Sequence, residues 1–155
     1  MRRILLVCTG NICRSPTAEG VLRARAAARG LREKLHFDSA GLHGYHVGEP
    51  PDPRTIRAAS ARGYDLSSLR ARRVTPQDFD RFDLLLGMDS SHVEALRRMA
   101  PLGSAAKVEP FDVEDVEDPY YGGPEGFERV LDQIERRAEM LLDAWFPYLL
   151  SLGGR

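Results

Sequence analysis

The residues best suited to chemistry lie close together near the start of the chain. Cys8 and Arg14 are separated by five positions, and Gly10 and Asn11 lie between them. A cysteine thiolate is a strong nucleophile, and the planar guanidinium of arginine can hold two phosphoryl oxygens with parallel hydrogen bonds. The pattern therefore indicates attack on phosphorus, with Cys8 as the nucleophile and Arg14 as the phosphate clamp.

The segment 8–15 joins a short apolar run to a predicted helix, and this junction favours a bound anion. Unpaired backbone N–H groups and the positive end of the helix dipole meet there. Gly10 and Asn11 tolerate the left-handed conformations that a concave nest of N–H groups requires. The same field favours the thiolate form of Cys8, to which the hydroxyl of Ser15 could donate a hydrogen bond.

The spacing of Cys8 and Arg14 is weak evidence by itself, because arginine is common in this chain and lysine occurs only at positions 34 and 107. The structural alternative is a buried, inert cysteine. The position between an apolar strand and a helix that starts with proline favours the nucleophile.

The elements that must position this loop are a strand before it and a helix after it. Residues 4–7 form a continuous apolar run, as expected for a strand buried on both faces of a parallel sheet. Ser15 is the predicted N-cap of the helix, Pro16 its first residue and Gly30 its end. Further strands are predicted at 35–37, 82–86 and 107–109, further helices at 55–62, 90–99 and 127–149, and an irregular loop at 39–53. Pro147 is expected to kink the last helix or end it early.

The alternation of strands and helices predicts an α/β fold, in which a parallel sheet carries helices on both faces. Ligands of such sheets bind at the carboxyl ends of the strands, and the loop that begins at Cys8 lies at one such end. The 155 residues fit one domain that spans positions 1–155, and the 43% hydrophobic and 29% charged residues are typical of a globular protein.

Charge, hydropathy and cysteine content exclude several classes of protein. The formal net charge of -1 argues against a nucleic-acid partner, and no apolar run is long enough to cross a membrane. The apolar stretch near the start is too short for a signal peptide, so we expect a cytoplasmic protein. Cys8 and Cys13 form neither a disulfide framework nor a zinc site, and the histidines at 36, 43, 46 and 92 lack ligand spacing. We expect a monomer that holds no metal.

Residues 7–16, which read Val-Cys-Thr-Gly-Asn-Ile-Cys-Arg-Ser-Pro, closely resemble the signature loop of the low-molecular-weight protein tyrosine phosphatases. Four further segments resemble the family in the family's order: Ser-Ala-Gly at 39–41, Gly-Glu-Pro-Pro-Asp at 48–52, Met-Asp at 88–89 and Asp-Pro-Tyr at 118–120. The resemblance implies a flavodoxin-like, three-layer domain with a central four-stranded parallel sheet and helices on both faces. It also implies that phosphotyrosine on proteins is hydrolysed through a phosphocysteine, without a metal or another cofactor.

Asp118 is the candidate general acid and base. Expelling an aryl oxide from phosphorus needs a proton, and the same carboxyl can then activate water against the phosphoenzyme. Asp118 is also one of six acidic residues between Asp112 and Glu125, which on composition alone would be a solvated charge run. The match to the family motif, in the family's order, favours the catalytic role.

The resemblance also assigns residues to substrate binding. They are Thr9, Gly10, Asn11, Ile12, Cys13 and Ser15 in the loop, and Tyr45, Tyr120 and Tyr121 as aromatic walls. Tyr45 could instead be an exposed loop tyrosine, and Asn11 could be merely a turn residue. Some family members place a histidine before the segment that matches 70–72, but Leu69 stands there in this chain. Asn11 must then be held differently, and Ser39 is a candidate.

Cys13 has two interpretations. It could be a small buried hydrophobic residue, or, as is common in the family, it could trap Cys8 as a reversible disulfide after oxidation. Asp52 and Arg54 are expected to brace the loop that carries Tyr45 rather than to contact substrate.

Related activities fit the sequence less well. A thioredoxin-coupled arsenate reductase needs cysteines beyond Cys13, and none follows. Arginine phosphatases of the family carry a threonine where this chain has Ile12, whose apolar side chain would pack on a phenyl ring. A thiol phosphocarrier has no use for an acid at Asp118, and a pure anion-binding module would need Cys8 never to react.

Overall fold

The computed structural model describes residues 1–147, and four strands and five helices follow one another along this part of the chain. The strands are β1 (Arg2–Cys8), β2 (Leu35–Gly41), β3 (Leu84–Gly87) and β4 (Lys107–Pro110). The helices are α1 (Arg14–Ala28), α2 (Pro53–Ser60), α3 (Asp78–Arg81), α4 (Ser90–Met99) and α5 (Pro124–Trp145). No helix within these residues is both long and apolar enough to span a membrane.

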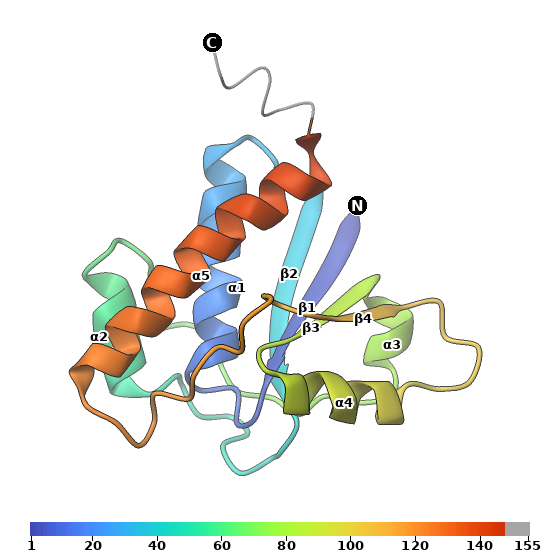
Figure 1. The fold of residues 1–155 in the computed structure, drawn as a ribbon, viewed down its shortest axis with the longest axis horizontal. Helices are drawn as coiled ribbons and strands as arrows, with labels where there is room; N and C mark the ends of the chain where they lie inside the picture. The colour runs from blue at the N-terminus through green and yellow to red at the C-terminus, as the bar shows by residue number, and fades with distance from the viewer. Residues whose placement is uncertain (148–155) are drawn as a thin grey trace.

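The four strands form one parallel sheet in the order β2-β1-β3-β4. The central strand β1 pairs with β2 from Arg2 opposite Leu35 to Cys8 opposite Gly41. Because the strands run in the same direction, their carboxyl ends face the same end of the molecule. The loop after β1 lies at that end, toward the bottom of the view in Figure 1.

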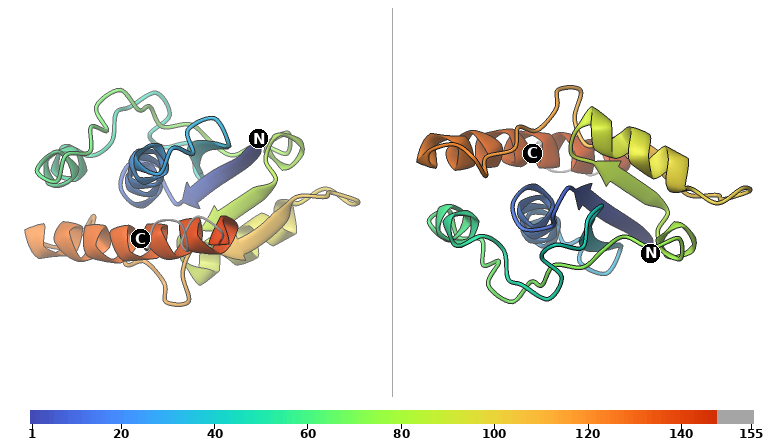
Figure 2. Two further views of the ribbon diagram at one scale, coloured as in Figure 1. Left: turned by 90° about the horizontal axis from the view of Figure 1, so that it is seen from above. Right: turned by 90° about the horizontal axis from the view of Figure 1, so that it is seen from below.

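Alternate residues of β1 face opposite sides of the sheet, and helices cover both sides. Ile4 and Leu6 pack with α1 and α5 in one core cluster. Leu5 and Val7 pack on the other side with Phe79 of α3 and with α4. Figure 2 shows α1 and α5 together on one side of the sheet and α3 on the other. The predicted flavodoxin-like α/β fold, with a four-stranded parallel sheet and helices on both faces, is confirmed.

The start of α1 differs from the prediction. Ser15 is not its N-cap, because the helix begins at Arg14, and the preceding Cys13 makes no side-chain capping hydrogen bond. The predicted end is confirmed: the helix stops before Gly30, which has a φ of 74° and donates its N–H to the carbonyl of Ala27. Ser15 is therefore free to turn its hydroxyl toward the end of β1.

Other boundaries differ for identifiable reasons. β2 continues past residue 37 to Gly41, because pairing with β1 extends a strand whose last residues have little strand propensity. The helix predicted at 55–62 is α2, which starts earlier because Asp52 caps it by accepting from the N–H of Arg54. α5 starts at Pro124 and ends before Pro147, and the alternative predicted end at 149 lies outside the described residues.

Candidate active site

The loop after β1 places a buried thiol beside a hydroxyl. Cys8 is 3% exposed, and its Sγ lies 3.0 Å from Oγ of Ser15. That hydroxyl oxygen accepts a hydrogen bond from Nδ2 of Asn11 at 2.8 Å, which leaves the proton of Ser15 available to the sulfur. The carbonyl of Ala40 is a weaker acceptor for this proton, at 3.5 Å. Ser15 can therefore donate to the Cys8 thiolate, as expected from the sequence.

Asn11 holds the loop in shape through its side chain. Nδ2 also donates to Oγ of Ser39 at 3.0 Å, and Oδ1 accepts from the N–H of Arg72 at 3.0 Å. The suggestion that Ser39 helps to hold Asn11 is confirmed. Burial raises the pKa of Glu19, whose carboxyl accepts from Ser39 at 2.6 Å at the far end of this network.

The backbone of the loop is shaped by Asn11 rather than by Gly10. Of the two residues that tolerate a left-handed conformation, Asn11 adopts it, with a φ of 60°, and Gly10 does not. A side chain at Gly10 would instead approach the ring of His46, 3.0 Å from an added Cβ. An added Cβ at Gly41 would lie 2.9 Å from the carbonyl oxygen of Thr9. Both glycines therefore allow close packing.

Arg14 is 4% exposed, and one nitrogen of its guanidinium, Nη1, is held by two acceptors. Nη1 donates to Oδ2 of Asp89 at 2.8 Å and to the carbonyl of Val116 at 3.0 Å. Nη2 donates to Oγ1 of Thr9 at 3.3 Å and lies 3.8 Å from Oδ2 of Asp118. The sequence singled out Asp89 only within the Met-Asp segment that resembles the family, and its task of orienting Arg14 was missed because the two residues are 75 positions apart.

Asp118 lies on the loop before α5, with its side chain 43% exposed. Its Oδ1 accepts the N–H of Tyr120 at 3.1 Å. Arg54 donates to the carbonyl of Tyr120 at 3.0 Å and lies 5.4 Å above the centre of that ring. Asp52 holds Arg54 with two side-chain hydrogen bonds of 3.0 and 2.8 Å. Through Arg54, Asp52 thus braces the loop that carries Asp118 and Tyr120, rather than the loop of Tyr45 that the sequence suggested.

One cavity of about 280 Å³ brings the predicted residues together. It is lined by Cys8, Thr9, Gly10, Ile12, Cys13, Arg14, Tyr45, His46, Asp118, Tyr120 and Tyr121. Asn11 and Ser15 are the two predicted residues that do not line this cavity, and they hydrogen-bond to each other behind its wall. His46 lines the cavity but was not predicted. A larger cavity of about 520 Å³ opens between α3, β4 and Trp145, and its wall contains no cysteine.

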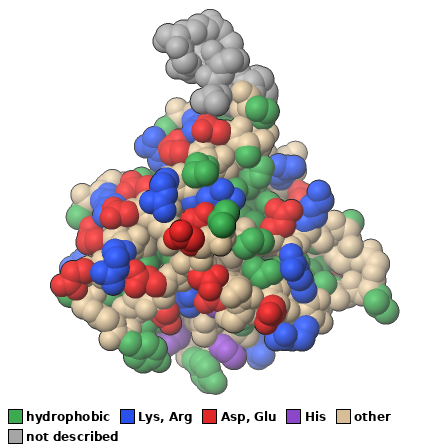
Figure 3. Space-filling view, in the orientation of Figure 1, with side chains coloured by type: hydrophobic (Ala, Val, Ile, Leu, Met, Phe, Trp, Pro, Cys, Tyr) green, Lys and Arg blue, Asp and Glu red, His purple; other side chains and the backbone are tan. Residues whose placement is uncertain are grey.

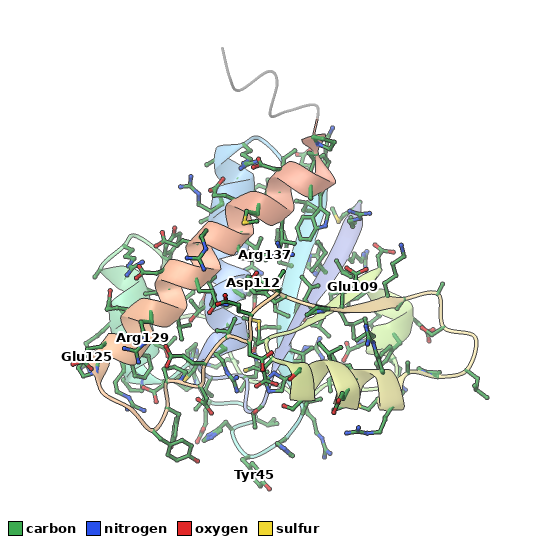
Figure 4. All side chains as sticks on the ribbon, in the orientation of Figure 1. Tyr45, Glu109, Asp112, Glu125, Arg129 and Arg137 are labelled. Carbon is green, nitrogen blue, oxygen red and sulfur yellow. The ribbon has the colours of Figure 1, made fainter. Side chains whose placement is uncertain are left out.

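Aromatic side chains project around the mouth of the cavity. Tyr45 is 83% exposed and stacks on His43 at 5.4 Å, and Figure 4 shows it pointing away from the body of the protein. Tyr121 is 90% exposed and makes an edge-on contact with Tyr120 at 4.9 Å. In Figure 3 hydrophobic side chains and histidines gather at this lower end of the molecule. Such rings can flank an aromatic substrate.

Cys13 is a free, buried cysteine beside the cavity. Burial raises the pKa of its thiol to about 12, and the negative charges of Asp52 and Asp118 act in the same direction. Cys13 therefore remains a neutral thiol at physiological pH, in contrast to the role assigned to Cys8.

A cysteine at the end of a central parallel strand, with an arginine and a carboxylate around one cavity, is the arrangement of a phosphatase that uses a cysteine nucleophile. The family model described as low molecular weight phosphotyrosine protein phosphatase matches residues 3–145. A low molecular weight protein-tyrosine-phosphatase of Streptomyces coelicolor is 45% identical over 152 residues, which cover 92% of each chain. The chain belongs to the low molecular weight phosphotyrosine protein phosphatase family.

Solved structures agree with this assignment. A protein tyrosine phosphatase from Entamoeba histolytica has a TM-score of 0.87 at 36% identity, over 93% of this chain and 97% of that chain. A Drosophila arginine phosphatase has a TM-score of 0.87 at 30% identity, over 94% of this chain and 98% of that chain. The same fold is thus found in a protein tyrosine phosphatase and in an arginine phosphatase.

Proposed function

We propose that Cys8, Arg14 and Asp118 hydrolyse phosphotyrosine on proteins in two chemical steps. The chain is a member of the protein-tyrosine-phosphatase family, and its substrate is a phosphoprotein. The observation that carries the proposal is that these three side chains line one cavity, with Asp118 3.8 Å from Arg14 at its mouth. A nucleophile, a phosphate clamp and a proton donor are thus within reach of one phosphoryl group.

In the first step the Cys8 thiolate attacks phosphorus in line with the tyrosine oxygen. An S–P bond forms as the P–O bond breaks, while Arg14 and the loop N–H groups hold the phosphoryl oxygens. Asp118, as the carboxylic acid, gives its proton to the departing phenolate oxygen. The products are a dephosphorylated tyrosine and a phosphocysteine.

In the second step Asp118 acts as a carboxylate. It takes a proton from a water molecule that attacks phosphorus, and the S–P bond breaks as the new O–P bond forms. Inorganic phosphate and the Cys8 thiolate result. The Ser15 hydroxyl, 3.0 Å from the sulfur, stabilises this leaving thiolate by a hydrogen bond.

Asp118→Ala tests the proton transfer. Hydrolysis of phenyl phosphate should slow by about a hundredfold, because the phenolate leaves without a proton. Hydrolysis of p-nitrophenyl phosphate should slow less, since its leaving group is a weaker base. The value of kcat/KM, which depends only on the steps up to release of the phenol, measures the difference, and equal losses of kcat/KM for both substrates would remove Asp118 from the role of proton donor.

Ile12 supports phosphotyrosine over phosphoarginine as the substrate. Its side chain lines the cavity next to Cys8, where an apolar surface packs on a phenyl ring and leaves a guanidinium poorly paired. We expect kcat/KM for a phosphotyrosine peptide to exceed that for the matched phosphoarginine peptide by about a hundredfold. Ile12→Thr should narrow this ratio, and Ile12→Val serves as the apolar control. A wild-type preference for phosphoarginine would contradict the assignment.

The remaining proposals concern the state in which the chain acts. All the proposed catalytic groups come from one chain, so we propose that it works as a monomer and as one catalytic domain over residues 1–155. We propose the cytoplasm as its compartment, because a reducing environment keeps Cys8 and Cys13 as the free thiols that the mechanism needs. Sedimentation at the assay concentration tests the monomer.

A further inference from the structure

His92 is buried directly beneath the phosphate clamp, yet the two chemical steps make no use of it. It is 1% exposed and lies in the first turn of α4, where its backbone N–H donates to the capping Asp89 at 3.1 Å. Its ring reaches the phosphate loop: Nε2 lies 2.9 Å from Oγ1 of Thr9, 83 positions away. A helix cap alone does not require this second contact.

The hydrogen bonds around the ring define its tautomer. The backbone N–H of Asp89 donates to Nδ1 of His92 at 3.2 Å, which favours a lone pair on Nδ1 and the ring proton on Nε2. Oδ1 of Asp89 lies 3.3 Å from the same nitrogen, but it already accepts from the N–H of His92 and from the hydroxyl of Ser91. Burial and the neighbouring Arg14 lower the pKa of His92 to about 4, against the opposing charges of Asp89, Asp118 and Asp115. The ring is therefore neutral at physiological pH, and Nε2–H donates to the hydroxyl oxygen of Thr9.

The Thr9 hydroxyl can then make only one further hydrogen bond, as a donor. Its Oγ1 accepts from Nε2 of His92 and from Nη2 of Arg14, at 2.9 and 3.3 Å, which occupies both lone pairs. The hydroxyl proton must point elsewhere, and Thr9 lines the cavity that receives the phosphoryl group. A phosphoryl oxygen in that cavity is a strong acceptor for this proton.

We propose that His92 is a positioning residue, which fixes the Thr9 hydroxyl as a neutral hydrogen-bond donor to the phosphoryl group beside Arg14. The inference rests on the proposed function of the cavity. It adds a hydrogen-bond donor, the Thr9 hydroxyl, which is oriented by a residue outside the phosphate loop. Thr9 touches the substrate, whereas His92 acts only through Thr9.

Four variants test the proposal: His92→Phe, His92→Gln, Thr9→Val and the double variant His92→Phe/Thr9→Val. Phenylalanine removes the donor but keeps a ring, and the glutamine amide can place a donor near the position of Nε2. We expect kcat/KM for phenyl phosphate, and the affinity for inorganic phosphate, to fall about tenfold in His92→Phe and in Thr9→Val. His92→Gln should recover most of this loss, and the double variant should be no worse than either single variant.

These outcomes separate positioning from mere packing. Multiplicative losses in the double variant, or equal losses in His92→Gln and His92→Phe, would overturn the proposal. If His92→Phe does not fold, the comparison of Thr9→Val with Thr9→Ser decides: a tenfold loss only in Thr9→Val supports the role, and equal activities overturn it.

A spectroscopic measurement is independent of turnover. Long-range ¹H–¹⁵N spectra of the wild-type protein at pH 7 should show His92 as the neutral tautomer protonated on Nε2. A proton on Nδ1, or an imidazolium, would overturn the proposal even in an active enzyme. Failure of the phosphatase proposal would appear differently, as absence of turnover in the wild-type protein.

Discussion

Cys8→Ser should abolish turnover while the protein stays folded. A serine hydroxyl at the end of β1 is hardly ionised at neutral pH, so no nucleophile is available to form the covalent intermediate. Steady-state release of p-nitrophenol from p-nitrophenyl phosphate measures the loss, which should exceed about a thousandfold. Circular dichroism and thermal unfolding provide the check on the fold.

The same variant should still bind inorganic phosphate, because the loop amides and Arg14 are unchanged. Titration calorimetry with phosphate therefore separates loss of the nucleophile from collapse of the site. Turnover by Cys8→Ser close to that of the wild-type protein would remove the nucleophile assignment.

Arg14→Lys should fail nearly as severely as Arg14→Ala, with a loss in kcat/KM of about a thousandfold. Lysine is a point charge and cannot form two parallel hydrogen bonds to a phosphoryl group. It also has one nitrogen to replace the donors that reach Asp89, Val116 and Thr9. The measurement is kcat/KM for phenyl phosphate.

Arg97→Lys is the matched control for this substitution. Arg97 lies on α4, where its Nη2 donates to the carbonyl of Val108 at 3.1 Å, apart from the cavity. Its replacement should leave kcat/KM within about twofold of the wild-type value. High activity of Arg14→Lys would show that a single positive charge suffices, and the bidentate clamp would have to be abandoned.

The parts of the fold that are determined by short apolar runs could be predicted from the sequence. Residues 4–7 are fully buried at the centre of the sheet, where strand propensity and burial favour the same conformation. The long helix α5 was recognised from its repeat of buried residues at helical spacing. β2 beyond residue 37 was not, because Asp, Ser, Ala and Gly become a strand only through pairing with β1. α3 spans four residues, too few for a helical period to be visible.

The site residues that are adjacent in the chain could be predicted from the sequence. The contacts between residues far apart in the chain could not. The loop of residues 8–15 could be proposed from its own sequence, and Asp118 from its motif. His92 was given no role because it lacks ligand spacing, and no local pattern shows that it reaches Thr9 at the carboxyl end of the sheet. Asp89 caps α4, and its contact with Arg14 could not be predicted because it depends on the tertiary fold.

The most direct measurement is alkylation of the two cysteines by iodoacetate at pH 7, followed by peptide mass spectrometry, with and without inorganic phosphate. The account predicts rapid modification of Cys8 alone, suppression of that reaction by phosphate, and no reaction at Cys13, whose buried thiol has a pKa raised to about 12. Slow modification of Cys8 that phosphate does not change would contradict it, because the sulfur would then be neither an anion nor part of an oxyanion site.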